Sequence, residues 1–328
     1  MRAALAALST IRTLTDLEVF LDERGGVYSP EMDYGQATPP VGAFAQLKRL
    51  QIDGRTTSVA AVISVIVAPK LEAVELACGD WHWDPETRDT VLVEDALTVI
   101  FNHLRRRTGT TLRKFHLSLR EYSGELFPKG TAPGTRFPIS AGPLLGLCRL
   151  EDVMIHQYRL SGDREYLCIN VPALVAAWPT LRFLTLPGLA VNMESLQVIS
   201  RTCTRLERLT AKCLSWSWFD VPGAMEGRSF RLDTAASDTI ASALRELRFE
   251  EPLKAILPDT ASNVARLLDS LFPQLIPERC SVVAIWTSRR QPEVRETYDV
   301  MDIVARLQRA RRDASMTADR MLDGPSRP

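Results

Sequence analysis

The sequence predicts an α/β fold in which a short strand, a loop and a helix recur about eight times. Such units stack into a curved parallel sheet with helices on its convex side. The main observation is a short phrase that recurs along the chain, with apolar residues at its first, fourth and sixth positions. In addition, helical periodicity precedes several copies, and Gly, Pro or Asp follows most of them. Those residues favour turns and end strands.

The clearest copy of the phrase lies between Cys203 and Cys213. Its apolar residues are Leu206, Leu209 and Ala211, and charged or hydroxyl residues stand between them. Leu209 and Ala211 alternate with polar residues, which is the period of a half-buried strand. A strand of roughly three residues is not stable by itself, so the phrase requires similar neighbours on both sides. The two cysteines fit this repeat as small buried spacers.

The other seven copies show the same pattern at irregular spacing. They lie at 14–21, 47–52, 71–76, 112–117, 147–155, 181–186 and 244–249. The middle apolar residues of consecutive copies are 24 to 41 residues apart, whereas one unit of this kind takes about 20–29 residues. Most units should therefore carry an inserted loop, and the copy at 147–155 should contain one extra residue. Loops are predicted at 22–40, 79–90, 123–143 and 215–236.

Four segments between the copies predict helices. Residues 59–67 are β-branched and apolar, and their place between two copies favours a helix over a strand. Residues 94–107 have one apolar face, acidic residues at the start and arginines at the end, as the helix dipole favours. The other two predicted helices are 171–178 and 193–201, the latter capped by Asn192.

The C-terminal part has a different pattern. A helix capped by Ser262 and Asn263 is predicted up to residue 272, then a strand at 280–286 and a last helix at 294–312. We interpret this part as a terminal cap, because an open end would leave apolar side chains in water. The predicted organisation is a repeat region of about eight irregular repeats at 1–255, a C-terminal cap at 256–312 and a disordered tail at 313–328.

The recurring phrases resemble leucine-rich repeats of the ribonuclease-inhibitor-like type, and the copy between Cys203 and Cys213 is similar to their cysteine-containing class in F-box proteins. The segment 264–273, with the following strand that holds Trp286 and the basic helix, resembles the end of fungal F-box/leucine-rich-repeat proteins. The resemblance covers roughly residues 10–312. It implies a leucine-rich-repeat solenoid whose repeats capture a protein.

In that family, an N-terminal F-box docks onto the adaptor of a cullin-type ubiquitin ligase. No F-box of the Leu-Pro-x-Glu-Leu type precedes the first phrase of this sequence. We therefore expect either a truncated chain or a role that does not include docking onto the ligase adaptor. In both cases the repeats would be the substrate-recognition part of a ubiquitin-ligase receptor, or derived from one.

Composition restricts the classes of partner and compartment. Lys plus Arg and Asp plus Glu both number 40, so the net charge of zero gives no long-range attraction to nucleic acid. No run approaches ~18 apolar residues, so no membrane span is expected. The six cysteines form no Cys-x-x-Cys pair, which favours thiols in the cytoplasm or nucleus. The alternative is a secreted repeat receptor with paired cysteines, since residues 1–12 have the pattern of a weak signal peptide.

The sequence contains no recognisable catalytic or metal-binding motif. Glycine-rich nucleotide-binding motifs and the hydrolase motif Gly-x-Ser-x-Gly are absent, and the four histidines have no ligand spacing. His116 and His156 fall at outward strand positions, where stacking would bring them onto one surface. Asp80 and Asp84 flank an aromatic segment, for which a solvated loop is a simpler interpretation than a cation site. We expect no cofactor, metal or catalytic residue; the alternative is a small α/β enzyme with an unrecognised site.

The expected function is therefore non-enzymatic binding of a protein partner, and two sets of residues are candidates for the surface. Strand alternation points one residue of each phrase toward the inner face of the sheet. These residues are Glu18, Gln51, Glu75, His116, Met154, Thr185, Thr210 and Arg248. The second set consists of loop aromatics, since Trp is frequent at binding hot spots. They are Trp81, Trp83, Trp216, Trp218 and Phe219, which alternatively cover the core of the sheet.

Overall fold

The computed structural model describes residues 2–21, 44–79, 90–120, 142–157, 174, 176–215, 242–255, 260–287 and 295–322. The chain divides into two compact units, Met1–Ala190 and Val191–Pro328. The division lies within strand β6 (Phe183–Asn192), near Gly188, whose φ of 97° lies in the region that favours glycine.

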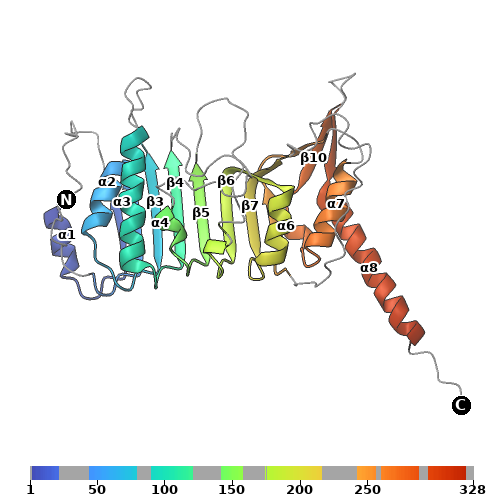
Figure 1. Cartoon of the computed structure of the whole chain (residues 1–328), viewed down its shortest axis with the longest axis horizontal. Coiled ribbons are helices and arrows are strands. Elements are labelled where there is room, and N and C mark those ends of the chain that lie inside the picture. Colours follow the sequence, from blue (N-terminus) through green and yellow to red (C-terminus); the bar gives the residue numbers. More distant parts are fainter. Residues whose placement is uncertain are drawn as a thin grey trace, which may run out of the picture. The chain divides into compact units, whose positions relative to one another are not determined.

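The first unit has α/β architecture with a parallel sheet. Before β6 it contains α1 (Arg2–Ser9), β1 (Asp16–Phe20), β2 (Arg49–Gly54), α2 (Thr56–Val65), β3 (Ala73–Gly79), α3 (Thr90–Thr108), β4 (Lys114–Arg120), α4 (Gly142–Leu145) and β5 (Asp152–Gln157). All the strands are parallel and lie in sequence order from β1 to β6. Helices α2, α3 and α4 lie on one face of the sheet (Figure 1).

The second unit combines parallel strands with a small mixed sheet. Its elements are α6 (Met193–Thr202), β7 (Arg208–Ser215), β8 (Glu246–Phe249), β9 (Leu253–Ala255), α7 (Thr260–Leu271), the 3-10 helix η1 (Pro277–Arg279), β10 (Val283–Thr287), β11 (Arg295–Asp299) and α8 (Val300–Leu322). Strands β7 and β8 are parallel. Strand β10 pairs with β9 in parallel and with β11 in antiparallel orientation.

A recurring turn begins most copies of the phrase. The leucine that opens the copy donates its backbone N–H to the carbonyl three residues earlier, at 3.1–3.3 Å. The pairs are Leu47 with Phe44, Leu71 with Ala68, Leu150 with Leu147, Leu181 with Trp178, and Leu206 with Cys203. The fifth phrase therefore begins at Leu150, and Leu147 belongs to the turn. The prediction of an extra residue in this copy was wrong, because apolar character alone does not separate the turn residue from the strand.

A ladder of backbone hydrogen bonds connects these turns. In most copies, the residue after the opening leucine donates its N–H to the equivalent carbonyl of the preceding copy, at 2.7–2.9 Å. The pairs are Lys48 to Thr15, Glu72 to Lys48, Arg113 to Glu72, Glu151 to Arg113, and Arg182 to Glu151 in the first unit; Arg245 to Glu207 and Ile276 to Arg245 follow in the second. Ile276 thus extends the ladder into the segment predicted to be a cap, and Ser281 forms a parallel bridge with Arg248.

In two copies, the backbone carbonyl of the leucine that opens the phrase accepts a hydrogen bond from a side chain of the next repeat. The hydroxyl of Thr111 donates to the Leu71 carbonyl at 2.9 Å, and the Thr180 hydroxyl donates to Leu150 at 3.0 Å. Leu275 forms the same turn, since its N–H donates to the Phe272 carbonyl, and its own carbonyl accepts from the side-chain amide of Gln308 in α8 at 3.1 Å. Helix α8 thus supplies the hydrogen bond that a side chain of a further repeat would supply.

The middle apolar residues of the phrases stack across the sheet and form the core of the first unit. Leu17, Leu50, Val74, Phe115, Val153 and Leu184 lie in register on consecutive strands, and each is at most 9% exposed. Phe115 contacts Phe101 of α3 edge to face, with ring centroids 6.0 Å apart. The stacked row therefore faces the helices, and the alternate residues of each strand face the other way.

Helices form largely where the sequence predicts them. Helix α2 covers the predicted segment 59–67 except for its last two residues. Helix α3 covers the whole predicted segment 94–107 and ends one residue beyond it. The Asn192 side chain accepts a hydrogen bond from the Ser195 N–H at 2.8 Å, so the predicted cap of α6 is confirmed. In the predicted helix 171–178, only Leu174 and residues 176–178 are described, and the Trp178 N–H donates to the Leu174 carbonyl.

Three features of the C-terminal part differ from the prediction. Helix α7 begins at Thr260, so Ser262 and Asn263 lie inside it and do not cap it. Residues 295–299 form β11, because pairing with β10 fixes an extended backbone, and α8 begins only after Asp299, whose carboxylate accepts from the Met301 N–H at 2.8 Å. α8 then continues to Leu322 through the predicted disordered tail, since no Gly or Pro interrupts 300–322.

His103 connects α3 to the end of α2. Its Nε2 lies 3.1 Å from the carbonyl oxygen of Ile66, the C-cap residue of α2. A carbonyl oxygen only accepts, so Nε2 carries the hydrogen. Burial lowers the pKa of His103 below its ordinary value of 6.5, and the nearby Arg107 and Arg106 act in the same direction. The folded chain thus favours the neutral imidazole.

Stability should consequently fall as the pH is lowered from about 7.5 to about 5. The contribution of a group whose pKa is lower in the folded state is complete above its unfolded pKa and is lost as pH falls through the folded pKa. The substitution His103→Gln keeps an N–H donor for Ile66 and does not titrate, so its stability should change less with pH than that of the wild type. Urea unfolding of both proteins across this pH range is the measurement, and parallel curves would contradict the assignment.

Candidate functional site

The outward residues of the first unit lie in one continuous row across its parallel strands. In register, the row runs through Glu18, Gln51, Glu75, His116, Met154 and Thr185. Their neighbours within each strand are the buried residues that face α2, α3 and α4, so the row lies on the opposite face of the sheet (Figure 1). The alignment predicted from strand alternation is confirmed for these six residues. We refer to them as the central row.

In the second unit, Thr210 and Arg248 are the equivalent pair, since they lie in register on β7 and β8. The sequence thus identifies the outward residues of both sets of strands. The aromatic candidates Trp81, Trp83, Trp216, Trp218 and Phe219 lie outside the described residues, as do Asp80 and Asp84. They remain predictions.

A network of polar side chains occupies the middle of the central row. Lys114 Nζ lies 2.7 Å from Glu75 Oε1. His116 lies between two carboxylates, with Nδ1 3.9 Å from Glu75 Oε1 and Nε2 3.3 Å from Asp152 Oδ1. The hydrogen bond from Lys114 keeps the pKa of Glu75 below its ordinary value, so this carboxylate stays charged at neutral pH. The network comes from three consecutive strands and holds its side chains in defined positions.

Both predicted histidines lie on this face. His116 is in register with Met154, and His156 is in register with Ser118, two positions further along the same two strands. The predicted common surface for the two histidines is confirmed. The His116 side chain is only 19% exposed, so neighbouring side chains surround most of the ring. Burial lowers the pKa of His156, which favours its neutral form.

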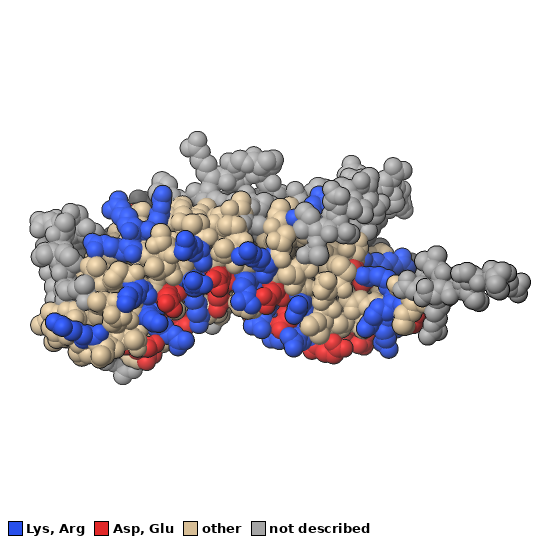
Figure 2. All heavy atoms as spheres, turned by 90° about the horizontal axis from the view of Figure 1, so that it is seen from below, with Lys and Arg blue, Asp and Glu red and all other residues tan. Residues whose placement is uncertain are grey.

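The face presents small groups of opposite charge next to half-buried apolar surface. Lys114 and the ring of His116 carry donors, Glu75 and Asp152 carry acceptors, and Met154 adds an apolar contact beside them. Figure 2 shows basic and acidic side chains intermixed on the side of the molecule that it draws. Such mixed chemistry matches the polar and apolar groups of a protein surface. Among the described residues, no group of three His, Cys, Asp or Glu side chains could hold a metal ion.

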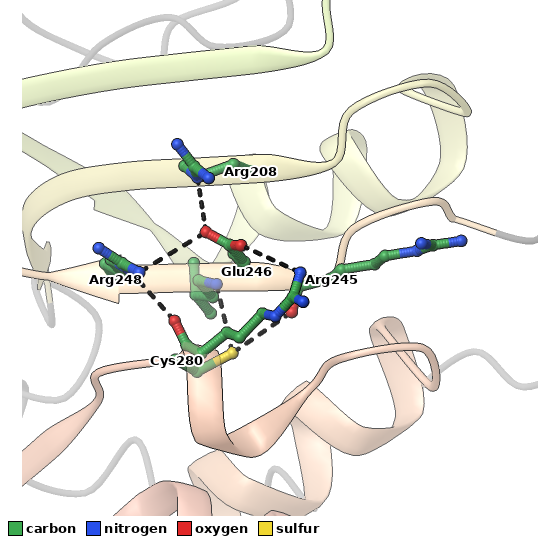
Figure 3. A network of polar contacts seen from close by, with 7 residues as sticks. Arg208, Arg245, Glu246, Arg248 and Cys280 are labelled. Carbon is green, nitrogen blue, oxygen red and sulfur yellow. Dashed lines mark hydrogen bonds and ion pairs between the residues drawn. The ribbon is translucent and has the colours of Figure 1, made fainter.

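A second polar cluster surrounds Glu246 on β8 (Figure 3). Its carboxylate lies 2.5 Å from Arg208 Nε, 3.6 Å from Arg279 Nη1 and 3.7 Å from Arg248 Nη2. The Glu246 side chain is 10% exposed, while the three arginine side chains are 44–59% exposed. The hydrogen bond from Arg208 is the main reason that the pKa of Glu246 is lowered. We refer to these four residues as the arginine cluster.

Cys280 and Cys203 are packed within the fold. Cys280 Sγ accepts a hydrogen bond from the Leu247 N–H at 3.3 Å and lies 3.6 Å from the Arg245 carbonyl (Figure 3). Burial raises the pKa of Cys280 to about 11 and that of Cys203 to about 12. Neither thiol is ionised at neutral pH, so neither has the thiolate that a nucleophile or metal ligand requires. Cys203 is buried in its turn, as the interpretation of a buried spacer predicts.

The sequence analysis missed several members of both polar groups. Lys114 and Asp152 occupy the outward positions two residues before His116 and Met154, so the same period of two indicates them. Arg208 and Glu246 occupy the equivalent positions on β7 and β8. Arg279 carries no such signal, because it comes from η1 and not from a recognisable phrase.

No family model matches the sequence, and no match to a curated protein was found. Within the described part of the chain, none of the helices has the length and apolar character needed to cross a membrane.

Proposed function

We propose that this protein is a non-enzymatic protein-binding scaffold, built as an irregular leucine-rich-repeat solenoid with a C-terminal cap. The recurring turn, the ladder of backbone hydrogen bonds and the stacked apolar row support this architecture. Each supports a chain of units that contact mainly their neighbours, which is the organisation of repeat proteins. The C-terminal cap is supported by Gln308, whose side chain donates to the Leu275 carbonyl in place of a side chain from a further repeat.

The observation that carries the proposal is the central row on the face opposite the helices. Parallel strands in successive units give an extended surface on which side chains at equivalent positions lie side by side. Lys114, His116 and the two carboxylates beside them already hold one another in place. A partner that binds there would have to immobilise fewer flexible side chains, which lowers the entropic cost of association.

We further propose that the scaffold is, or derives from, the substrate-recognition part of an F-box ubiquitin-ligase receptor in the cytoplasm or nucleus. The support is the resemblance of the phrases and of the C-terminal pattern to fungal F-box/leucine-rich-repeat proteins. Binding of the purified chain to the ligase adaptor, measured by calorimetry, tests docking directly. Absence of binding would remove the docking role and leave the scaffold proposal to the experiment below.

The substitution Met154→Asp should abolish capture of the partner. Met154 is half-buried next to His116 and Asp152, and a third carboxylate there would add repulsion and remove an apolar contact. A hot-spot residue near the centre of an interface contributes more than about tenfold to affinity, and we expect this of Met154. The measurement is quantitative affinity purification with wild-type and variant protein, with folding checked by circular dichroism.

Arg106→Asp is the matched control, because Arg106 is exposed on α3, a helix on the other face of the sheet. This variant introduces the same side chain without touching the central row. The amounts of the proteins that it captures should therefore equal those captured by the wild type. Equal loss in both variants, or equal retention in both, would contradict the assignment of the binding surface.

A further inference from the structure

The arginine cluster brings together residues from β7, β8 and the segment that follows α7. Arg208 and Glu246 are in register on adjacent strands. The bridge between Arg248 and Ser281 places Arg279 beside Glu246 on the other side, because both segments run in parallel. One carboxylate thus lies between two arginines across the strands, and Arg248 follows two positions along β8 (Figure 3).

The contacts of the three arginines with Glu246 are unequal. Only Arg208 makes a hydrogen bond to the carboxylate, at 2.5 Å. Arg248 and Arg279 lie at 3.7 and 3.6 Å, beyond ordinary hydrogen-bonding distance, and their side chains are 51% and 59% exposed. Most of the N–H donors of these two guanidinium groups therefore face solvent.

Arg248 and Arg279 are nevertheless held in place. Arg248 Nε donates to the Arg279 carbonyl at 3.2 Å, which fixes the plane of its guanidinium group relative to the Arg279 backbone. The attraction of Glu246 restricts Arg279. Two oriented guanidinium groups can each bind a carboxylate through two parallel hydrogen bonds. Because their side chains are already restricted, less rotamer entropy is lost on binding.

We propose that Arg248 and Arg279 bind carboxylate side chains of an acidic peptide segment in the protein partner. The inference rests on the proposed protein-binding function, since it names the chemistry of one partner segment. Extended peptides place alternate side chains on one side about 7 Å apart, and neighbouring strands lie about 5 Å apart. Two alternate acidic side chains can therefore each engage one of two guanidinium groups on neighbouring segments.

A nucleic acid fits this surface less well than an acidic peptide. Glu246 lies between the arginines, and Glu251, in the segment between β8 and β9, lies 3.4 Å from Lys212 of β7. A continuous phosphate backbone would bring its charges close to these carboxylates, whereas a peptide can place its acidic residues only where the arginines lie. The whole chain has no net charge, so it also lacks the general attraction on which nucleic-acid binding depends.

The test uses the full chain and a fluorescent peptide in which Glu and Ser alternate, with binding followed by fluorescence anisotropy at low salt. Arg248→Gln and Arg279→Gln should each weaken binding about fivefold, the magnitude of one exposed charge pair. Arg49→Gln is the matched control, because Arg49 is 77% exposed and lies outside the cluster. Its binding should equal that of the wild type.

Three results of the peptide and oligonucleotide measurements, and one of the control variant, would overturn the inference. The first three are failure of the acidic peptide to bind the wild type, equal binding of the same peptide with Gln in place of Glu, and stronger binding of a single-stranded oligonucleotide. Equal weakening by Arg49→Gln would also overturn it, since general charge would then explain the effect. The Met154→Asp experiment tests a different surface, the central row. A negative result with the acidic peptide would therefore not contradict the scaffold proposal.

Discussion

Replacement of Phe115 by alanine is expected to destabilise the first unit by about 3–5 kcal/mol. Phe115 is fully buried, lies in register between Val74 and Val153, and packs edge to face against Phe101 of α3. Its removal takes away an aromatic contact and leaves a cavity between the sheet and the helix. Because strands and helix share this ring, neither can close the cavity without losing the register of the ladder.

The control for this substitution is Lys114→Ala, one residue away on the outward face. Lys114 is 37% exposed and pairs with Glu75, so its removal should cost less than about 1 kcal/mol. Denaturant unfolding gives both free energies, and amide hydrogen exchange of β3, β4 and β5 locates the effect. A loss for Phe115→Ala no larger than that for Lys114→Ala would disprove the role of the stacked row as the core.

Replacement of Trp178 by alanine should have an effect of similar size, about 3–5 kcal/mol. Trp178 is 1% exposed and occupies the turn position that Phe44, Ala68, Leu147 and Cys203 occupy in other copies. It is the largest side chain among these five equivalent positions. We therefore expect Trp178 to fill a volume in its repeat that a smaller side chain would leave partly empty.

The variant Trp178→Phe separates the two contributions of the indole. Trp178 Nε1 donates to the Leu144 carbonyl in α4 at 3.4 Å, and phenylalanine keeps much of the apolar area but lacks this donor. The expected loss is about 1–2 kcal/mol, from one buried hydrogen bond and some lost area. Thermal and urea unfolding of the two variants provide the comparison. Equal losses for Phe and Ala would show that the aromatic ring contributes little.

The stacked strands were predictable because the information for them is local. Each copy of the phrase contains its own alternation, and that alternation alone assigns residues such as Glu75 and His116 to the outward face. The contact of His116 with Asp152 was not predictable, because the two residues are 36 positions apart and only the register of β4 and β5 brings them together. The predicted loop at 123–143 separates the two residues in the sequence, so their spacing does not give the register.

The errors at the C-terminal end have the same origin. Residues 295–299 adopt a strand only because β10 is available to pair with them, which is a tertiary effect that overrides local propensity. Arg279 joins Glu246 through a segment without the leucine pattern. The continuation of α8 past residue 312 was, in contrast, predictable from the absence of Gly and Pro in 313–322, whereas the disordered tail was predicted from its terminal position.

The hydrogen bond from Gln308 to Leu275 affects whether two molecules of this protein can associate through the ends of their sheets. Parallel strands leave a row of unpaired backbone groups at the end of a sheet, where a second copy could continue the pairing and start a polymer. In this chain, the Val300 N–H donates to the Val282 carbonyl, and Gln308 donates to the Leu275 carbonyl, whose equivalents in earlier copies accept from a threonine hydroxyl of the next repeat. Helix α8 thus occupies two acceptors at this end of the ladder, which disfavours addition of a second molecule there.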